Sequence, residues 1–113
     1  MKLNEYQEQV LVCDYLDILM QQGKIVNYTA VNPRPNMEHV GQRIKAKKAG
    51  LHPGFPDLII LTKRKAFCIE LKIKPNKLTL EQKRWFEDLM DAMIPCYLAY
   101  GYEEARKIID SWL

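Results

Sequence analysis

The sequence predicts a single α/β domain, spanning residues 1–113, in which helices flank one mixed β-sheet. The chain is 48% hydrophobic and 27% charged, which is typical of a globular protein with one core. Apolar residues recur with a period of two in the middle of the chain and with helical spacing towards both ends. The expected order is helix, strand, basic loop with a short helix, two-stranded ribbon, helix, strand and helix. This order favours a sheet covered by helices.

The first expected helix covers residues 4–22. Asn4 is a suitable N-cap and Gly23 a suitable stop. The apolar stripe of this helix consists of Val12, Leu16 and Leu19. Glu5 and Glu8 continue the same helical face, so a carboxylate near the start of the helix is expected to turn towards the domain. A second interpretation is that these first-turn acids complement the helix dipole, and the two interpretations are compatible.

The next segments are expected to lead the chain into the centre of the sheet. Residues 25–31 are β-branched and alternating, which predicts a strand. The Pro-containing segment 32–36 breaks regular structure, and residues 37–49 form a basic, weakly apolar pattern that predicts a loop with a short exposed helix. Gly and Pro residues then make 50–56 a turn-rich connection to the following strand.

A two-stranded ribbon is expected from Asp57 to Lys72. Two apolar runs flank a charged turn at 63–65, which is the pattern of two strands joined by a short connection. In the second run Glu70 and Lys72 alternate onto one face, opposite the large apolar side chains. The ribbon is therefore expected to bring Asp57 close to Glu70 and Lys72.

The last third of the chain is expected to form a helix, a strand and a helix. Thr79 and Gln82 have the spacing of a capping box, which starts a helix that ends near residue 93. Residues 95–100 then predict a strand and residues 102–113 a closing helix. The side chains expected to be buried on the first of these helices are Leu80, Trp85, Phe86, Leu89, Met90 and Met93.

Positive charge is concentrated in the middle of the chain. Residues 43–84 contain twelve of the seventeen Lys and Arg residues but three of the fourteen acids, so this segment carries +9 and the remainder −6. Such a segment favours a polyanion-binding surface with nucleic acid as the partner, although exposed lysines also serve solubility alone. Trp85 is interpreted as a core residue, with stacking on a base as the alternative.

Cysteine usage and hydropathy indicate a cytoplasmic protein. Cys13, Cys68 and Cys96 are widely spaced among apolar neighbours, so they are expected to be reduced core residues and not disulfides or zinc ligands. No apolar run approaches the length of a membrane span, and the first residues lack the apolar core of a secretory signal. No association with a membrane is expected.

Asp57, Glu70 and Lys72 together predict a site for phosphodiester hydrolysis. Two carboxylates offer hard oxygen ligands to a divalent cation, and an ammonium beside them can act on a water or a phosphate. A Glu-x-Lys pattern is a weak signal by itself. The Pro56-Asp57 step, the apolar neighbours, the glutamates of the first helix and the surrounding basic charge strengthen it.

These residues resemble a known nuclease signature. Pro56-Asp57 followed by Glu70-x-Lys72 resembles the PD-(D/E)xK pattern, and the fuller pattern is similar to the virus-type replication-repair nuclease (VRR-NUC) branch of that superfamily. The resemblance extends over nearly the whole chain and implies a restriction-endonuclease-like core. The segments that carry it are Glu5-x-x-x-Gln9, Gly54-Phe55-Pro56-Asp57, Ile69-Glu70-Leu71-Lys72 and Thr79-Leu80-Glu81-Gln82 with Trp85.

The resemblance implies a Mg2+- or Mn2+-dependent DNA endonuclease that selects branched DNA, such as Holliday junctions or flaps. Asp57, Glu70 and the backbone carbonyl of Leu71 would bind the metal. Lys72 would orient or help deprotonate the attacking water and stabilise charge on the phosphate. Small stand-alone members of the family occur in phages, so the expected location is the cytoplasm of a bacterium or of a phage-infected host.

Further residues are expected to complete this site. Glu5 matches the helical glutamate of the family and Glu8 is the second choice, and the sequence does not separate them. Gln82 would lie beside the lysine and help to fix the substrate or the lysine. The residues expected to contact the DNA backbone without reading sequence are Arg43, Lys45, Lys47, Lys48, Lys74 and Lys77.

A small domain has little surface with which to hold a four-way junction, so a homodimer with two active sites is expected. Two alternatives to the nuclease stay open. One is a non-catalytic nucleic-acid-binding module on the same fold, which would bind DNA without cutting it. The other is a cytosolic interaction protein in which Glu70 and Lys72 only pair on a strand face, so that changing them would alter stability and not DNA affinity.

Overall fold

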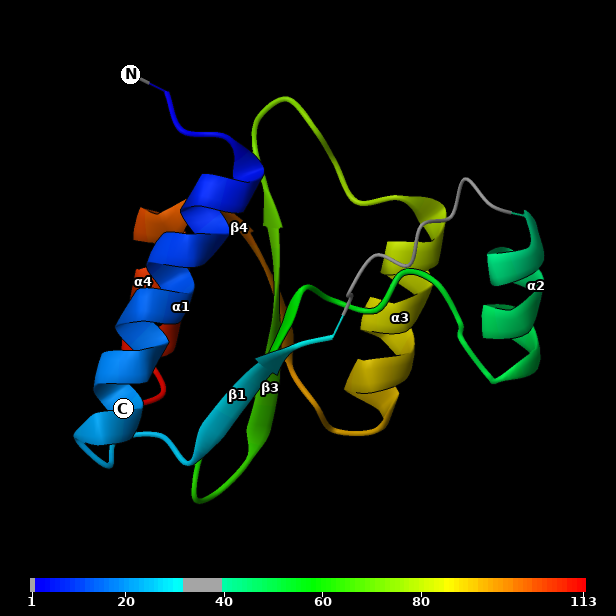
Figure 1. Ribbon diagram of the computed structural model, residues 1–113. Helices are drawn as coiled ribbons and strands as arrows, with labels where there is room; N and C mark the ends of the chain where they lie inside the picture. The colour runs from blue at the N-terminus through cyan, green and yellow to red at the C-terminus, as the bar shows by residue number, and fades with distance from the viewer. Residues whose placement is uncertain (1, 32–39) are drawn as a thin grey trace.

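The structure is a computed structural model that describes residues 2–31 and 40–113. Its strands are β1 (Asn27–Ala30), β2 (Leu58–Leu61), β3 (Ala66–Lys72) and β4 (Cys96–Tyr100). Its helices are α1 (Glu5–Gln21), α2 (Val40–Lys48), α3 (Leu80–Asp91) and α4 (Tyr102–Asp110). The strands form one sheet in the order β1-β2-β3-β4, in which the first two pairs are antiparallel and β3 and β4 are parallel. The predicted mixed sheet and order of elements are confirmed (Figure 1).

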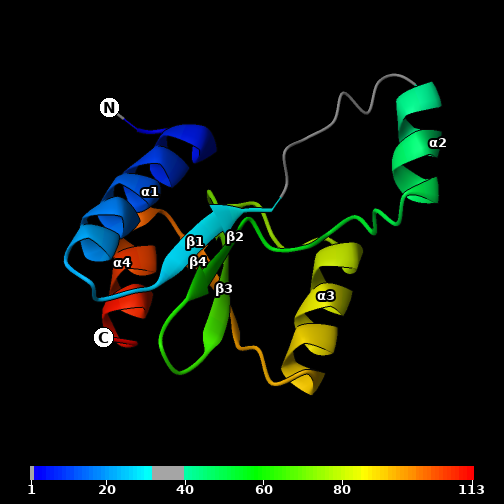
Figure 2. The ribbon, with the colours of Figure 1, turned by 60° about the horizontal axis from the view of Figure 1, so that its bottom comes forward.

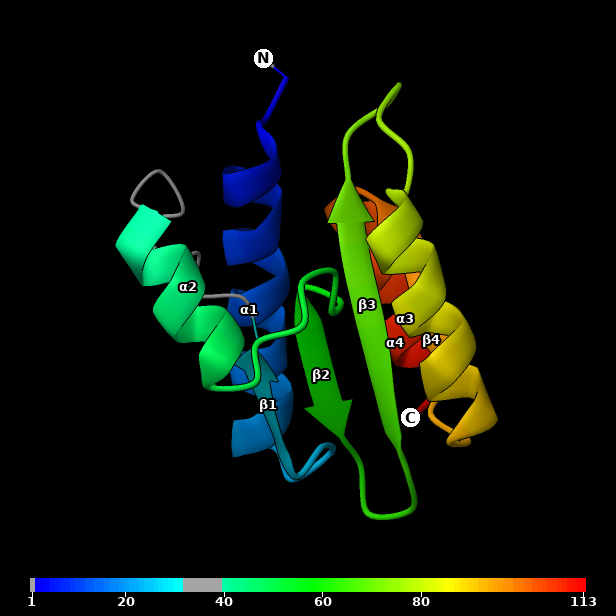
Figure 3. The ribbon, with the colours of Figure 1, turned by 90° about the vertical axis from the view of Figure 1, so that its right-hand side faces the viewer.

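The helices are divided between the two faces of the sheet. α1 and α4 lie together on one face and α3 lies on the other (Figures 1 and 3). α2 stands apart from the sheet and from the other helices, and none of its side chains is buried (Figure 2). The predicted break at 32–36 and the first residues of the predicted basic segment lie outside the described residues.

The main core lies between the sheet and the helix pair α1 and α4. The alternation predicted for the second ribbon strand is confirmed, because Phe67 and its same-face neighbours point into this core while Glu70 points to the face of α3. Phe67 also stacks on Trp112, with ring centroids 4.6 Å apart. The buried core residues of the helices are Val12, Leu16, Leu19, Ala105 and Ile109. The apolar stripe predicted for the first helix is therefore correct.

The burial predicted for α3 is wrong in part. Leu80 is 66% exposed, Met90 60% and Met93 79%, and Leu89 is the buried residue of this helix. The physical reason is that α3 covers its sheet face alone. A single helix on a sheet buries a narrow stripe, whereas α1 and α4 also bury surface against each other. The spacing of apolar residues correctly indicated which side of α3 faces the sheet. It did not indicate how many residues on that side are buried.

The predicted helix caps are confirmed. Asn4 caps α1 in a capping box with Gln7, and Thr79 caps α3 in a capping box with Gln82. Gly23 follows the end of α1 with φ +70°, a conformation that glycine adopts at little cost. No helix within residues 2–31 and 40–113 combines the length and the apolar character needed to cross a bilayer.

Candidate active site

The ladder between β2 and β3 continues beyond its last regular pair through side-chain contacts. Leu58 pairs with Ile69 in the antiparallel register. One residue earlier, the Asp57 N–H donates to Glu70 Oε1 at 3.2 Å, and the Leu71 N–H donates to Asp57 Oδ2 at 2.8 Å. The two hydrogen bonds hold Asp57 against the end of β3. The ribbon therefore brings Asp57 and Glu70 together, as the sequence predicts.

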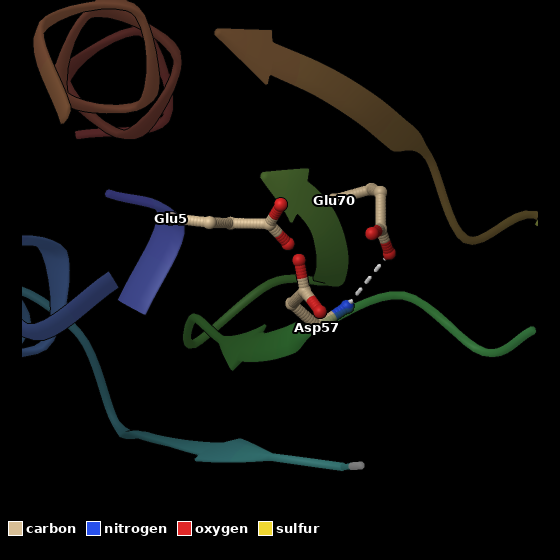
Figure 4. Close-up of side chains that lie close together, drawn as sticks. All are labelled: Glu5, Asp57 and Glu70. Carbon is tan, nitrogen blue, oxygen red and sulfur yellow. Dashed lines mark hydrogen bonds between the residues drawn. The ribbon is translucent and has the colours of Figure 1, made fainter. Parts of the chain in front are cut away.

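Glu5 completes a cluster of three acids. It projects from the first turn of α1 towards Asp57 and Glu70, which come from the start of β2 and from β3 (Figure 4). One carboxylate oxygen from each of the three residues lies within 4.8 Å of the others. Three converging hard oxygen donors fit a divalent cation of the Mg2+ or Mn2+ type, which prefers carboxylate ligands and retains some water.

Glu8 lies outside this cluster. Its Oε2 accepts the N–H of Tyr102 at 2.7 Å, at the start of α4. The preceding Gly101 offers no side-chain cap, so Glu8 supplies the acceptor that the exposed N–H groups of α4 require. The sequence did not distinguish Glu5 from Glu8. The structure brings Glu5 to the acidic cluster and Glu8 to the start of α4.

Glu70 is a buried acid with three close polar neighbours. It is 2% exposed, and no other charged side chain among the described residues is buried. Gln82 Nε2 donates to Glu70 Oε2 at 3.2 Å, and Lys72 Nζ lies 3.8 Å from the same oxygen. Burial and then the charge of Asp57 raise the pKa of Glu70 to about 8, against the opposing effect of Lys72. At neutral pH the metal-free carboxyl therefore holds a proton, which a cation would displace.

Gln82 is oriented by its role in the helix cap. Its Oε1 accepts the Thr79 N–H at 2.8 Å, which directs the amide nitrogen of the same side chain towards Glu70. The sequence placed Gln82 beside the lysine. In the structure, Gln82 and Lys72 approach the same oxygen of Glu70. The capping box of α3 thus fixes a carboxylate of the cluster.

Trp85 holds the connection that precedes Asp57 against α3 through hydrogen bonds to its backbone. Its Nε1 donates to the carbonyls of His52 at 3.2 Å and Pro53 at 3.0 Å, and its ring meets Phe55 edge-on at 4.9 Å. Trp85 is half-buried at this junction, so it contributes to a local contact and not to the main core. Sequence reasoning missed this role, although an indole N–H beside a turn-rich segment needs an acceptor.

Gly54 allows the same connection to lie against the start of α3. Its φ is +102°, and a Cβ at this position would lie 2.7 Å from the backbone carbonyl carbon of Glu81. The neighbouring Pro56 is fully buried. The segments Gly54-Phe55-Pro56-Asp57 and Thr79-Leu80-Glu81-Gln82 are therefore packed against each other, and together they position the acids.

Comparison with known proteins identifies the family. The family model described as the VRR-NUC domain matches residues 2–103. The chain belongs to the VRR-NUC family. A solved structure described as a "VRR_NUC domain protein" is similar over 100% of this chain and 90% of that chain, with a TM-score of 0.64 and 23% identity, which shows the shared fold. A comparison with curated proteins gives no match. Membership of the VRR-NUC family implies a nuclease-type fold and suggests hydrolysis of DNA with a divalent metal.

The basic residues of segment 43–84 in this VRR-NUC domain lie on several separate elements. Those of the turn at 63–65 lie at the far end of β3 from Lys72, about 20 Å away at the usual rise of a strand. The predicted DNA contacts are all exposed and lie on α2 or in the loop after β3. They are Arg43, Lys45, Lys47 and Lys48 on α2, and Lys74 and Lys77 in the loop.

Replacing Gly54 tests whether its contact with α3 holds the site. Gly54→Ala should lower the free energy of unfolding by about 1–3 kcal/mol more than Gly50→Ala. Both glycines have positive φ, +102° and +96°, but a Cβ at Gly50 would meet nothing within 4 Å. The shared conformational strain therefore cancels in the comparison. Urea unfolding of both variants is the measurement, and equal losses would show that the contact with Glu81 is unimportant.

The raised pKa of Glu70 predicts a pH-dependent stability. Between about 4.5 and about 8, the unfolded chain has released this proton while the folded, metal-free chain retains it. The free energy of unfolding should therefore fall as pH rises through this window, by an amount on the order of a few kcal/mol. Glu70→Gln should remove this component. Urea unfolding in EDTA at several pH values compares the two proteins, and parallel curves would refute the assignment.

Proposed function

We propose that this VRR-NUC domain is a Mg2+- or Mn2+-dependent DNA endonuclease that selects branched DNA such as Holliday junctions or flaps. The observation that carries the proposal is the convergence of Glu5, Asp57 and Glu70 beside Lys72. The branched substrate follows from the family resemblance. The proposed setting is DNA repair or recombination in the cytoplasm of a bacterium or phage-infected cell, in keeping with the free state of the described cysteines.

Asp57, Glu70 and the carbonyl of Leu71 are the proposed metal ligands. The Leu71 N–H donates to Asp57 Oδ2, which holds this carboxylate at the end of β3. The N–H and C=O of one strand residue leave on the same side of the strand, so the Leu71 carbonyl also faces Asp57. Glu5 adds charge from α1. When bound, the cation polarises the phosphate and activates a water.

Lys72 is the proposed partner of the attacking water. Its Nζ lies 3.8 Å from Glu70 Oε2, and the side chain is 12% exposed, so it reaches the cluster from a largely desolvated position. From there it can hold the water, take part in its deprotonation and stabilise negative charge on the phosphate. Gln82 is a positioning residue, because it holds the Glu70 carboxylate through a hydrogen bond.

The exposed lysines and arginine of α2 and of the loop after β3 are proposed to bind the DNA backbone. Their side chains are free to approach phosphates, and phosphate contacts give affinity without sequence preference. Binding should therefore weaken as salt increases. The shape of the substrate, and not its sequence, is the proposed basis of selection.

Cleavage of labelled DNAs tests the proposed activity. The panel contains duplex, single strand, flap and four-way junction, with Mg2+ or Mn2+. Asp57→Asn and Lys72→Ala should each lower the cleavage rate by about 100-fold or more, since the first weakens a proposed metal ligand and the second removes a cation beside the reacting phosphate. Lys63→Ala, in the turn at the far end of β3, should cut like the wild type.

The same panel separates the alternatives. Binding of DNA by the wild type with no cuts in either metal would indicate the non-catalytic module. An interaction protein would be indicated by two results together. The wild type would not cut DNA, and the Glu70→Gln and Lys72→Ala variants would show altered stability with unchanged DNA affinity. Cuts by Asp57→Asn at the wild-type rate would remove this carboxylate from the mechanism.

A homodimer is proposed to present two active sites to a branched DNA. The outward face of α1 exposes large apolar side chains, Tyr6 at 75%, Val10 at 39% and Ile18 at 49%. Burial of these side chains against a second copy would remove apolar surface from water. Light scattering should give twice the monomer mass, and Val10→Ser/Ile18→Ser should shift the protein towards monomer. A wild type that remains monomeric at high concentration and on DNA would contradict the dimer.

A further inference from the structure

An open pocket of about 310 Å3 lies beside the acidic cluster, at the carboxyl ends of β3 and β4. It is lined by residues at the ends of these two strands, by the residues that precede α1, and by Glu8 of α1 and Glu104 of α4. The proposed function uses two of its nine lining residues, Lys72 at the acidic cluster and Lys74 as a contact to the DNA backbone. The pocket therefore needs its own explanation.

The topology of the sheet accounts for the position of this pocket. β3 and β4 are parallel neighbours. The chain leaves β3 towards α3 on one face of the sheet and leaves β4 towards α4 on the other (Figure 1). Where two such connections diverge, a crevice opens outside the carboxyl ends of the strands, and this is the usual position of ligands in open α/β sheets.

The cations of the pocket favour an anionic ligand. Lys2, Lys72 and Lys74 line it. Within residues 2–31 and 40–113, neither Lys2 nor Lys74 forms an ion pair with a carboxylate. Lys74 Nζ instead lies 5.5 Å from the ring centre of Tyr100, which also lines the pocket. Two ammonium groups are thus available to a ligand.

The acids of the pocket are already engaged by backbone donors. Glu8 accepts the Tyr102 N–H, and Glu104 Oε1 accepts the Tyr100 N–H at 2.9 Å. Both carboxylates therefore serve the start of α4 and the end of β4. Their charge is partly offset by the positive end of the α4 dipole. The pocket remains suited to a negatively charged group.

Lys72 connects the pocket to the acidic cluster. Its Nζ approaches Glu70, and its side chain also lines the pocket. Tyr100 is the register partner of Lys72 on the adjacent strand, so the two side chains lie next to each other on one face of the sheet. Any anion in the pocket is therefore a close neighbour of a phosphate bound at the acids.

We propose that the pocket binds one nucleotide of the cleaved strand, immediately next to the scissile phosphate. Its phosphate would contact Lys2 and Lys74, and its sugar and base would pack against Tyr100 and Leu3. This inference rests on the proposed nuclease function. The volume is at the lower end of the range for small-molecule sites, about 300–1,000 Å3, and the pocket is open to solvent. A nucleotide that is already unpaired can enter the pocket without the cost of breaking a base pair, so the proposal favours a strand that is unpaired at this position.

Binding of a mononucleotide tests the pocket without metal or cleavage. Thymidine 5′-monophosphate, added to the full chain in EDTA, should shift the backbone amide NMR signals of Tyr100, Gly101 and Tyr102 in a saturable manner. The double variant Lys2→Ala/Lys74→Ala should weaken this binding about tenfold, which is the effect of losing charge-assisted contacts. The control Lys63→Ala/Arg64→Ala should bind like the wild type. Shifts confined to other residues, or equal binding of inorganic phosphate, would overturn the proposal.

Cleavage then relates the pocket to the substrate. A duplex with one unpaired nucleotide beside the cut should be preferred to a continuous duplex, and Lys2→Ala/Lys74→Ala should raise KM about tenfold and abolish the preference. If the wild type cuts and this variant behaves like the Lys63→Ala/Arg64→Ala control, the pocket inference fails and the nuclease stands. If the mononucleotide binds but no DNA is cut, the nuclease fails, and the assignment of the pocket to a cleaved strand fails with it.

Discussion

The geometry of the candidate active site depends on two reciprocal hydrogen bonds at the start of β2. The Asp57 N–H meets the side chain of Glu70, and the side chain of Asp57 meets the Leu71 N–H. The Asp57 carbonyl also accepts the Val31 N–H at 3.1 Å, which extends the ladder towards β1. Buried backbone N–H groups need hydrogen-bond acceptors, and beyond its last regular pair the ladder between β2 and β3 no longer provides them. The two acids do so, and the sheet thereby fixes the separation of its own carboxylates.

α3 holds this junction from the opposite face. Leu89 is its buried residue, so α3 contributes modestly to the core. Its first turns instead hold three parts of the site. Gln82 reaches Glu70, the backbone of Glu81 lies against Gly54, and Trp85 binds the carbonyls of the connection before Asp57. A change in the position of α3 would therefore move both the Glu70 carboxylate on β3 and the connection that leads to Asp57.

Local patterns in the sequence predicted the elements, their caps and the pairing of Asp57 with Glu70, because each depends on residues close together in the chain. The choice between Glu5 and Glu8 could not be made in this way. Residues three apart share a helical face, and the position of Glu8 is decided by Tyr102, 94 residues away. Exposure of Met90 likewise depends on whether a second helix covers its face. The basic residues are continuous in the sequence, but the length of β3 separates the turn at 63–65 from the acidic cluster.

The start of α1 links the proposed metal cluster to the proposed nucleotide pocket. Glu8 fastens α1 to α4, and Glu5, one turn earlier, then lies opposite Asp57. Glu8 also lines the pocket, and Lys2 enters it from the residues just before the helix. One rigid helix terminus therefore sets the position of an acid of the cluster and the wall of the pocket. Because Lys72 borders both proposed sites, contacts among α1, α4 and the ends of β3 and β4 would determine the spacing between a scissile phosphate and its neighbouring nucleotide.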